Sequence, residues 1–460
     1  MRNNPFSKGF SSIIRVSTYM GIALNSPPFL QEEKMKPKEF IEKLEAGFYD
    51  GRLIMLYGES ALSAQKKRYT EAVRCFEELY PDREEIKVFS ASGRTEIGGN
   101  HTDHQHGCVL AAAVNLDVIA IVSFHSEGVI RLKSAGYPAD TVDLSDLSIH
   151  EEEKGKSASI IRGIASYFVN SGVEIGGFDA YTTSDVLSGS GLSSSAAFEV
   201  LVGTIIDKHY NEGKAGAVEI AKIGQYAENV YFGKGSGLMD QMVSSVGGFV
   251  LIDFKDNTAP VIENISFDFE KSGYSVCITD TKGSHSDLTD DYVSIPTEMK
   301  RVAAFFGKDV LREVSEEEFY SKLPQLREVC NDREILRAAH FFGENKRAVD
   351  EAKALAKGSL DEFFGFVRSS GDSSANLLQN LYSAKYPTRQ EIPLGIMISK
   401  RFLGERGAVR VHGGGFAGTI QAFVPNELVE GYSAEMNRIY GEGSCHILSI
   451  RPAGGIEITE

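Results

Sequence analysis

A glycine-serine segment near the middle of the chain has the composition of a phosphate-binding loop. Residues 189–197 read GSGLSSSAA, and an apolar pattern with helical spacing follows directly. Gly189 and Gly191 lack a Cβ, so backbone N–H groups can approach an anion closely, and the start of a helix adds its positive dipole end. The serine hydroxyls could cap the helix or coordinate a metal ion. The segment therefore predicts an anion site, although a loop that only caps a helix would have the same composition.

Two further glycine-punctuated segments lie far from this loop in the sequence. Residues 93–104 read GRTEIGGNHTDH, and residues 409–418 read VRVHGGGFAG. Phosphoryl transfer needs a polyanion that is held still, a divalent metal ion, and a group that orients or deprotonates the acceptor hydroxyl. Glycine-rich loops can hold the polyanion, hydroxyls and carboxylates can bind the metal ion, and a carboxylate can deprotonate the acceptor hydroxyl. The motif GxxxxGK[ST] does not occur in the chain, which excludes a Walker-type site.

The elements that must position these segments alternate between strands and helices. Short β-branched runs predict strands at 86–90, 117–124, 129–132, 178–183, 247–254, 274–279, 409–411 and 420–424. Helical spacing of apolar residues predicts helices within 36–80, 157–168, 194–211, 218–232 and 316–369. This mixture, without a fixed-period repeat, predicts an α/β (α+β) fold.

The composition is that of an ordinary globular enzyme. The 460 residues include 42% hydrophobic residues and carry a net charge of -16, which argues against a nucleic-acid-binding surface. The five cysteines are scattered and never spaced as CxxC, which favours a reducing cytoplasm over a disulfide framework or a zinc cluster. The most apolar stretch, 108–124, is interrupted by Asn115 and Asp117 and falls short of a membrane-spanning helix.

The chain divides into three parts by composition. Residues 1–34 contain a short apolar run interrupted by polar residues, which makes a poor secretion signal, so we expect an extension outside the folded domains. An upstream start codon read before Met35 would give the same extension. The polar segment 255–260 predicts a boundary between an N-terminal domain at 35–256 and a C-terminal domain at 257–460.

Together, the three glycine segments resemble the signature motifs of the galactokinase family. This family belongs to the GHMP kinase superfamily, which also contains homoserine, mevalonate and phosphomevalonate kinases. The family patterns are GRxNxIGEHTDY, GxGLSSSA and RMTGGGFGG, and this chain carries them in the same order. Residues 227–229, 237–241, 285–292 and 337–344 resemble further family segments. The resemblance implies a two-domain GHMP-kinase fold with the active site in the inter-domain cleft, and ATP-dependent phosphorylation of galactose or a close galacto-configured sugar at its C1 hydroxyl.

The resemblance also implies roles for individual residues. Asp240 would take the proton of the sugar hydroxyl, and Arg94 beside it would hold that carboxylate ionised. The sugar would be bound by Asn100, His101, Asp103 and Tyr292. ATP would be bound by Gly189, Ser190, Gly191, Leu192, Ser193, Ser194, Ser195, Gly414 and Gly415. Mg²⁺, which prefers hard oxygen ligands, would be held by Ser195 and Glu228. Plainer roles are a helix cap for Asp240 or Ser195, a surface ion pair for Arg94, and a solvated helix position for Glu228.

The first motif departs from the family pattern where the acceptor is chosen. The EHTDY glutamate is replaced by Asn100, its tyrosine by His104, and the GRxN asparagine by Glu96, while Ala417 interrupts the last glycine pair. In galactokinases that glutamate faces the C6 hydroxyl of the sugar, so a neutral amide removes a negative charge there. The acceptor could therefore be galactose, or instead galacturonate, arabinose or N-acetylgalactosamine.

Other classes of protein fit parts of the sequence. A non-catalytic galactokinase-like sensor of sugar and ATP has no need of the complete set Arg94, Ser195, Glu228 and Asp240. The histidines within 101–106 suggest a metal site, but the HxHxDH spacing of binuclear hydrolases and a second ligand cluster are lacking. A dinucleotide site is disfavoured because the GSG segment has no third glycine.

The remaining expectations concern partners and the adenine site. We expect sugar and ATP as small-molecule partners, no nucleic acid or membrane, and a monomer or weak homo-oligomer in the cytoplasm. The chain has no tryptophan, whereas relatives commonly place one near the nucleotide base, on the helix that here begins near Ser157.

Overall fold

Two β-sheets organise the chain, and the larger one is built around a single long strand. The computed structural model describes residues 35–186, 191–284 and 287–460. Strand β2 (Cys108–Phe124) pairs with β1 (Lys87–Gly98) along most of its length. Its two halves pair on the opposite edge with different strands, the N-terminal half with β6 (Phe249–Asp253) and the C-terminal half with β5 (Gly177–Ser184). The apolar run expected to form buried secondary structure is therefore one strand, shared by both halves of the sheet.

The rest of this eight-stranded sheet is added at its edges. The order is β12-β1-β2-β5-β3-β4, with β6 on β2 and β7 on β6. The pair β3–β5 is parallel and the other pairs are antiparallel. The added strands are β3 (Val129–Ser134), β4 (Ala139–Asp143), β7 (Val261–Ile265) and β12 (Ile456–Glu457).

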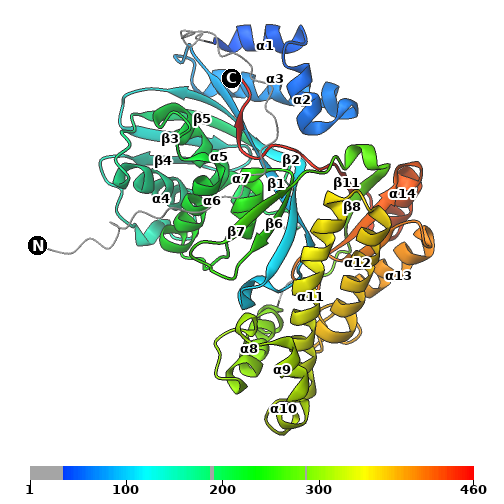
Figure 1. Ribbon diagram of the computed structural model, residues 1–460. Helices are drawn as coiled ribbons and strands as arrows, with labels where there is room; N and C mark the ends of the chain where they lie inside the picture. Colours follow the sequence, from blue (N-terminus) through cyan, green and yellow to red (C-terminus); the bar gives the residue numbers. More distant parts are fainter. Residues whose placement is uncertain (1–34, 187–190, 285–286) are drawn as a thin grey trace, which may run out of the picture.

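Helices cover both faces of the C-terminal half of β2, because its side chains alternate between two apolar cores. Ile119 and Ile121 pack with the helices α1 to α3, whereas Val118, Ala120 and Val122 belong to the core on the opposite face. Helices α1 (Pro37–Glu45), α2 (Asp50–Tyr57) and α3 (Leu62–Leu79) form a layer at one end of the molecule, blue in Figure 1. The other helices of this half are α4 (Ser157–Asn170), α5 (Ser194–Tyr210), α6 (Gly216–Tyr226), the π-helical η4 (Ala227–Phe232) and α7 (Met239–Val246).

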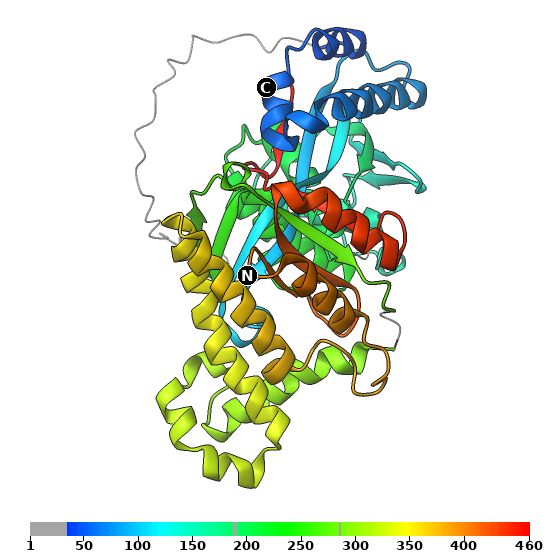
Figure 2. The same ribbon diagram turned by 90° about the vertical axis from the view of Figure 1, so that its right-hand side faces the viewer.

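A four-stranded antiparallel sheet organises the C-terminal part. Its order is β11-β8-β10-β9, formed by Cys445–Leu448, Tyr274–Asp280, Thr419–Pro425 and Ala408–Val411. Helices α11 (Asp332–Ala356) and α12 (Leu360–Ser373) run side by side (Figure 2), and α13 (Glu391–Leu403) and α14 (Val429–Tyr440) pack nearby. A capping box starts α11, since Asn331 Oδ1 accepts from Glu334 N at 3.0 Å.

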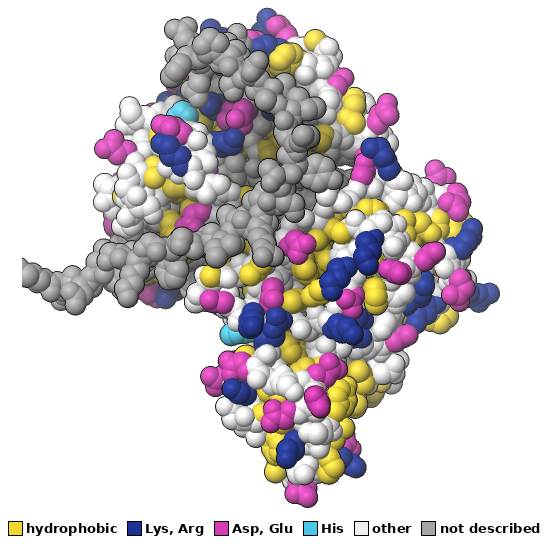
Figure 3. Space-filling view, viewed as in Figure 1, with side chains coloured by type: hydrophobic (Ala, Val, Ile, Leu, Met, Phe, Trp, Pro, Cys, Tyr) yellow, Lys and Arg dark blue, Asp and Glu magenta, His cyan; other side chains and the backbone are white. Residues whose placement is uncertain are grey.

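A smaller helical group extends from the end of the molecule opposite to α1–α3 (Figure 1). It comprises α8 (Thr289–Phe305), α9 (Glu316–Ser321) and α10 (Leu323–Val329). None of the helices in the described ranges is long and apolar enough to cross a membrane. On the face seen in Figure 3, acidic and basic side chains are interspersed over the described surface.

The predicted domain boundary falls at a turn between two paired strands. The segment 255–260 forms the turn between β6 and β7, and β7 pairs with β6 in register Phe249 to Ile265. Near the end of the chain, β12 pairs with β1 of the larger sheet. A cut at 257 thus separates two strands of one hairpin, because a polar turn between paired strands has the same composition as a linker between domains. The expected extension 1–34 lies outside the described residues.

Candidate active site

Three segments that are distant in the sequence meet at the side chain of Arg94. Arg94 Nε donates to Asp240 Oδ1 at 2.8 Å, and Nη2 donates to Ser193 Oγ at 3.1 Å. Nη1 donates to the carbonyl oxygen of Gly191. Arg94 comes from β1, Ser193 occupies the position before the first residue of α5, and Asp240 lies in the first turn of α7. One guanidinium therefore fixes the glycine-serine loop and the candidate base relative to each other.

The carboxylate of Asp240 is held in its ionised form. Burial alone would raise its pKa, but the charge and hydrogen bond of Arg94, a hydrogen bond from Ser193 Oγ and the charge of Lys234 together lower it. The Asp240 side chain is 31% exposed, so one side of it can still meet a substrate. The plainer roles are wrong here, because Asp240 bonds to side chains instead of capping α7 and Arg94 is only 9% exposed.

His101 and Tyr292 both hold the third glycine segment. His101 Nε2 lies 2.9 Å from the carbonyl oxygen of Gly414, and the Tyr292 hydroxyl donates to the carbonyl oxygen of Gly415 at 2.9 Å. A Cβ at Gly414 would lie 2.7 Å from the Tyr292 ring, so glycine is needed for this approach. Gly414 and Gly415 do not line the cavity described below, and their carbonyl groups face residues expected to bind the sugar.

Asp103, which is expected to bind the sugar, is a carboxylate with open acceptor capacity. It lies in a 3-10 turn, η2 (Asp103–Gln105), and none of the described residues donates a hydrogen bond to its carboxylate. Its charge reaches Arg94: burial would lower the pKa of that guanidinium, but Asp240, Glu96 and Asp103 together raise it. A carboxylate with free lone pairs can accept from two neighbouring hydroxyls.

Asn100, by contrast, is buried and its amide bonds within the protein. Its side chain is 1% exposed, and Nδ2 donates to Glu96 Oε1 at 3.0 Å and to the carbonyl oxygen of Gly413 at 2.7 Å. Its Oδ1 accepts from Asn380 Nδ2 at 2.9 Å. Protein groups therefore already use the amide of Asn100, so this geometry gives no support to its expected role in binding the sugar.

Glu96 and Asn100 form a couple in which the residue types of the family pattern are exchanged. The pattern GRxNxIGEHTDY has asparagine where this chain has Glu96, and glutamate where it has Asn100. Glu96 pairs with Arg410 at 2.6 Å, and that arginine is fully buried. The two positions thus keep one amide and one carboxylate, but here the carboxylate is Glu96, which forms a buried ion pair with Arg410.

A cavity of about 730 Å³ lies beside the start of α5. Ser194, Ser195 and Glu228 line its polar part. Its apolar and aromatic lining residues include Val118, Tyr137, Ile160, Phe198 and Phe232. These aromatic rings, which the sequence patterns do not single out, offer a surface for a planar base without a tryptophan. Of the predicted loop residues, Gly189 and Ser190 lie outside the described residues, and Leu192 is fully buried in the apolar core.

The predicted metal ligands face this cavity together. Ser195 is exposed and does not cap α5, since the cap position is Ser193. Glu228 is 3% exposed, so it is not a solvated helix residue, and its carboxylate accepts from Lys234 Nζ at 2.8 Å and from Gln241 Nε2 at 2.9 Å. Within the described part of the chain, no set of three or more histidine, cysteine or acidic side chains is arranged to hold a metal ion.

A second carboxylate stands beside Glu228 that sequence patterns did not identify. Glu199 follows Ser195 by one turn of α5, is 1% exposed, and accepts from the same Gln241 Nε2 at 2.8 Å. Burial, followed by the charge of Glu228, raises the pKa of Glu199 well above its usual value. Its spacing of one helical turn from Ser195 could have placed it on the same side of the helix, but only the fold brings it close to Glu228.

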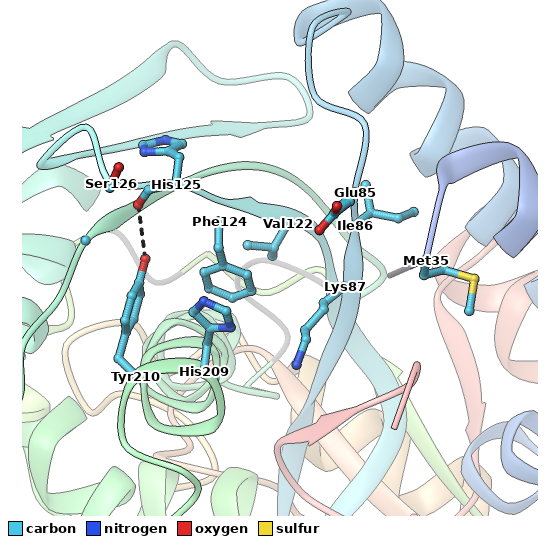
Figure 4. Close-up of a pocket in the computed structure, with 11 residues that line it drawn as sticks. Met35, Glu85, Ile86, Lys87, Val122, Phe124, His125, Ser126, His209 and Tyr210 are labelled. Atoms are coloured by element: carbon cyan, nitrogen blue, oxygen red, sulfur yellow. Dashed lines mark hydrogen bonds between the residues drawn. The ribbon is translucent and has the colours of Figure 1, made fainter. Parts of the chain in front are cut away.

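A smaller cavity of about 340 Å³ lies elsewhere, beside the end of β2 (Figure 4). Its lining includes the stacked rings of Phe124 and His209, whose centroids are 3.5 Å apart. None of the motif residues line it, so it is separate from the candidate active site.

Comparisons with known proteins agree with the motifs. Residues 74–124 match the galactokinase galactose-binding signature, and residues 159–248 match the GHMP kinases N terminal domain. The chain is 32% identical over 363 residues to a galactokinase of Glaesserella parasuis serovar 5 (strain SH0165), covering 77% of this chain and 89% of the relative. It is also 32% identical over 347 residues to a galactokinase of Actinobacillus pleuropneumoniae, covering 74% and 85%.

Solved structures agree in fold. Lactococcus lactis galactokinase complexed with galactose superposes with a TM-score of 0.70 at 22% identity, covering 83% of this chain and 98% of that one. A Methanococcus jannaschii mevalonate kinase superposes with a TM-score of 0.56 at 16% identity, covering 79% and 98%.

The exchanged couple predicts a rescue by double substitution. Asn100→Glu sets a second carboxylate against Glu96 and the carbonyl of Gly413, so it should lower the free energy of unfolding by about 2–4 kcal/mol. The double variant Glu96→Asn with Asn100→Glu restores one amide and one carboxylate beside Arg410, and should recover more than half of that loss. Urea unfolding of both single variants and the double variant measures the coupling. A loss in the double variant equal to the sum of the two single losses would contradict the predicted coupling.

Two buried glutamates on α11 predict opposite pH effects on stability. Burial and Glu344 raise the pKa of Glu351, whose carboxyl lies against Gly98 and has no hydrogen-bond partner among the described residues. Burial would raise the pKa of Glu344 too, but His340, Arg347, Arg410 and Ser370 lower it to about 2. The folded state therefore favours neutral Glu351 and ionised Glu344.

Accordingly, Glu351→Gln should increase the free energy of unfolding at pH 8 by about 1 kcal/mol or more. This gain should vanish as the pH falls towards about 4.5, the pKa of a glutamate in the unfolded chain. Glu344→Gln should destabilise it at pH 7, because the contribution of ionised Glu344 is present above that value and is lost only as the pH falls towards 2. Thermal unfolding between pH 4.5 and 8 measures both; shifts of the same sign would refute the assignment.

Proposed function

The chain belongs to the galactokinase family and is an ATP-dependent sugar kinase, and on that premise we propose that it phosphorylates the C1 hydroxyl of galactose or a close galacto-configured sugar. The observation that carries this proposal is the Arg94–Asp240 pair. It sets an ionised carboxylate, held at 2.8 Å by a buried guanidinium, beside the glycine-serine loop. That arrangement joins a candidate base to a candidate phosphate site, as phosphoryl transfer requires.

We assign the chemical roles as follows. Asp240 accepts the proton of the C1 hydroxyl while that oxygen forms a bond to the γ-phosphorus of ATP, and the bond from that phosphorus to the ADP oxygen breaks. Arg94 keeps Asp240 ionised and contributes positive charge near the transferring group. Gly191 and residues 193–195, at the start of α5, would hold the phosphates of ATP through backbone N–H groups and hydroxyls.

Mg²⁺ is the metal we propose for the site, bound by the Ser195 hydroxyl and the Glu228 carboxylate. Both are hard oxygen donors that line the same cavity, and Mg²⁺ commonly takes only one or two protein ligands besides phosphates and waters. Lys234 Nζ lies 2.8 Å from Glu228 Oε1, so this carboxylate already attracts a cation, and the metal would exchange with that ammonium. When bound, the ion would offset the charge of the phosphates.

We propose Asp103 as the main acceptor of hydrogen bonds from the sugar ring. His101 and Tyr292 act by holding the Gly414–Gly415 backbone, with their hydrogen bonds at 2.9 Å as support. Position 100, where the family has its sugar-facing glutamate, carries an asparagine whose amide is used within the protein. No carboxylate therefore stands at that position. This supports an acceptor range that extends to galacturonate, arabinose or N-acetylgalactosamine.

We place the enzyme in the cytoplasm, as a monomer or weak homo-oligomer. All five cysteines lie within the described residues and are free thiols, which supports a reducing compartment.

A sugar panel tests the function. ADP release should depend on sugar, with turnover for one or more of galactose, galacturonate, arabinose and N-acetylgalactosamine, and none for glucose, whose C4 configuration differs. Turnover of galactose alone would remove the wider acceptor range. ATP and sugar binding without ADP release from any of these sugars would favour the non-catalytic sensor.

Replacing the base separates chemistry from binding. Asp240→Asn keeps the size of the side chain but removes the proton acceptor, so turnover should fall by roughly 10²–10⁴-fold. ATP affinity, measured by calorimetry, should change by no more than a few fold. Asp372→Asn, an exposed carboxylate on α12, is the control and should turn over normally. Near-normal turnover of the Asp240 variant would contradict its assignment as the base.

A further inference from the structure

An arginine from the N-terminal helical layer reaches the wall of the nucleotide cavity. Arg68 lies in α3, and it precedes the first range matched by a family model, which begins at residue 74. Its side chain passes to the larger sheet and contacts Asp117 in the middle of β2 and Thr183 near the end of β5. The contacts join a residue outside the matched ranges to the strand that leads to the glycine-serine loop.

The guanidinium of Arg68 bridges two carboxylates. Nη1 lies 2.7 Å from Asp117 Oδ1 and 3.0 Å from Asp185 Oδ2. Nη2 donates to the carbonyl oxygens of Asp117 at 3.0 Å and of Thr183 at 3.2 Å. The backbone N–H of Asp185 also donates to the carbonyl oxygen of Asp117 at 2.9 Å. Arg68 thus fixes both the backbone at the end of β5 and the residue that follows it.

The inner side of this bridge is anchored. Asp117 is fully buried and also accepts from Arg451 Nη1 at 2.8 Å, from Ser90 Oγ and from the Tyr57 hydroxyl. A carboxylate with this many donors has little freedom to move. The Arg68 side chain is itself only 12% exposed, whereas Asp185 is 40% exposed at the outer end. The bridge therefore connects a rigid interior to a more exposed segment.

That exposed segment forms part of the nucleotide cavity. Thr183, Ser184 and Val186 line it, on both sides of Asp185 along the chain, and so does Val118, which follows Asp117. The backbone N–H of Val186 donates to Ser184 Oγ at 3.1 Å, which keeps this stretch in a tight turn. Displacement of Asp185 would move residues on this wall.

We propose that Arg68 is a positioning residue for nucleotide binding, through which the helical layer α1–α3 sets the wall of the ATP cavity. It touches neither substrate. It acts by holding Asp185 and the end of β5 against Asp117. This role rests on the proposed function in one respect, namely that the cavity binds ATP.

Three substitutions test it. Asp185→Asn removes the outer charge of the bridge but leaves the buried Arg68–Asp117 pair, so it separates positioning from folding. Arg68→Met removes the bridge entirely. Arg83→Met is the matched control, since Arg83 also contacts β5, with Nε 2.6 Å from Asp179 Oδ2, and neither residue lines the nucleotide cavity.

Calorimetric titration with ATP is the readout, because it does not depend on turnover. Asp185→Asn and Arg68→Met should weaken ATP binding by about 5- to 20-fold, whereas Arg83→Met should stay within about two-fold of the unmodified chain. The KM for ATP should rise without a matching rise in the KM for sugar. Urea unfolding should show Asp185→Asn close to the unmodified chain, because its ion pair is partly exposed.

Unchanged ATP affinity in Asp185→Asn, or equal weakening in Arg83→Met, would overturn the proposal and leave Arg68 a purely structural role. Failure of the proposed function looks different, since ATP would bind while no sugar is phosphorylated. An unmodified chain that binds no ATP overturns both.

Discussion

The guanidinium of Arg94 is the constraint on which the site depends. It offers several donors in one fixed plane, and here it uses them on Asp240, Ser193 and Gly191. Burial by itself would raise the pKa of Asp240 and disfavour its ionised form, and Arg94 is the largest influence that reverses this. The same side chain fixes the backbone of the glycine-serine loop. Position and charge of the candidate base therefore both follow from one residue near the middle of β1.

The sugar side is held by buried polar contacts between the two sheets. Glu96 pairs with Arg410, Asn100 bonds to Glu96, Asn380 and Gly413, and His340 Nε2 lies 2.9 Å from the carbonyl oxygen of Asn100. Buried polar groups tolerate little displacement, because an unpaired member carries its full desolvation penalty. The third glycine segment is thereby fixed opposite the first. The exchange of amide and carboxylate at positions 96 and 100 keeps this network while it moves the charge from position 100 to position 96.

The nucleotide side is built differently. Aromatic and aliphatic side chains line the broad part of the cavity, and charged groups stand at its polar end, where Glu199, Gln241, Glu228 and Lys234 share hydrogen bonds. An apolar wall suits a planar base, and an open polar end suits phosphates and a cation. Arg68 of α3 contacts both Asp117 and the end of β5, which forms part of this wall. The two proposed subsites thus adjoin at Arg94, but they are stabilised by different interactions.

The sequence by itself determined most helices and strands, the order of the three motifs, and the pairing of Arg94 with Asp240 that the resemblance implied. The elements and motifs depend on local periodicity and on residue types at fixed spacing, which a single chain displays directly, whereas the pairing of Arg94 with Asp240 came only from the resemblance. Only the tertiary structure decided that β7 and β12 belong to the larger sheet, that Glu199 stands beside Glu228, and that Asn100 is buried. The amide of Asn100 is used by a carbonyl 313 residues away, at Gly413. Whether a polar side chain faces a substrate or is consumed within the protein depends on such distant partners, and no local pattern encodes them.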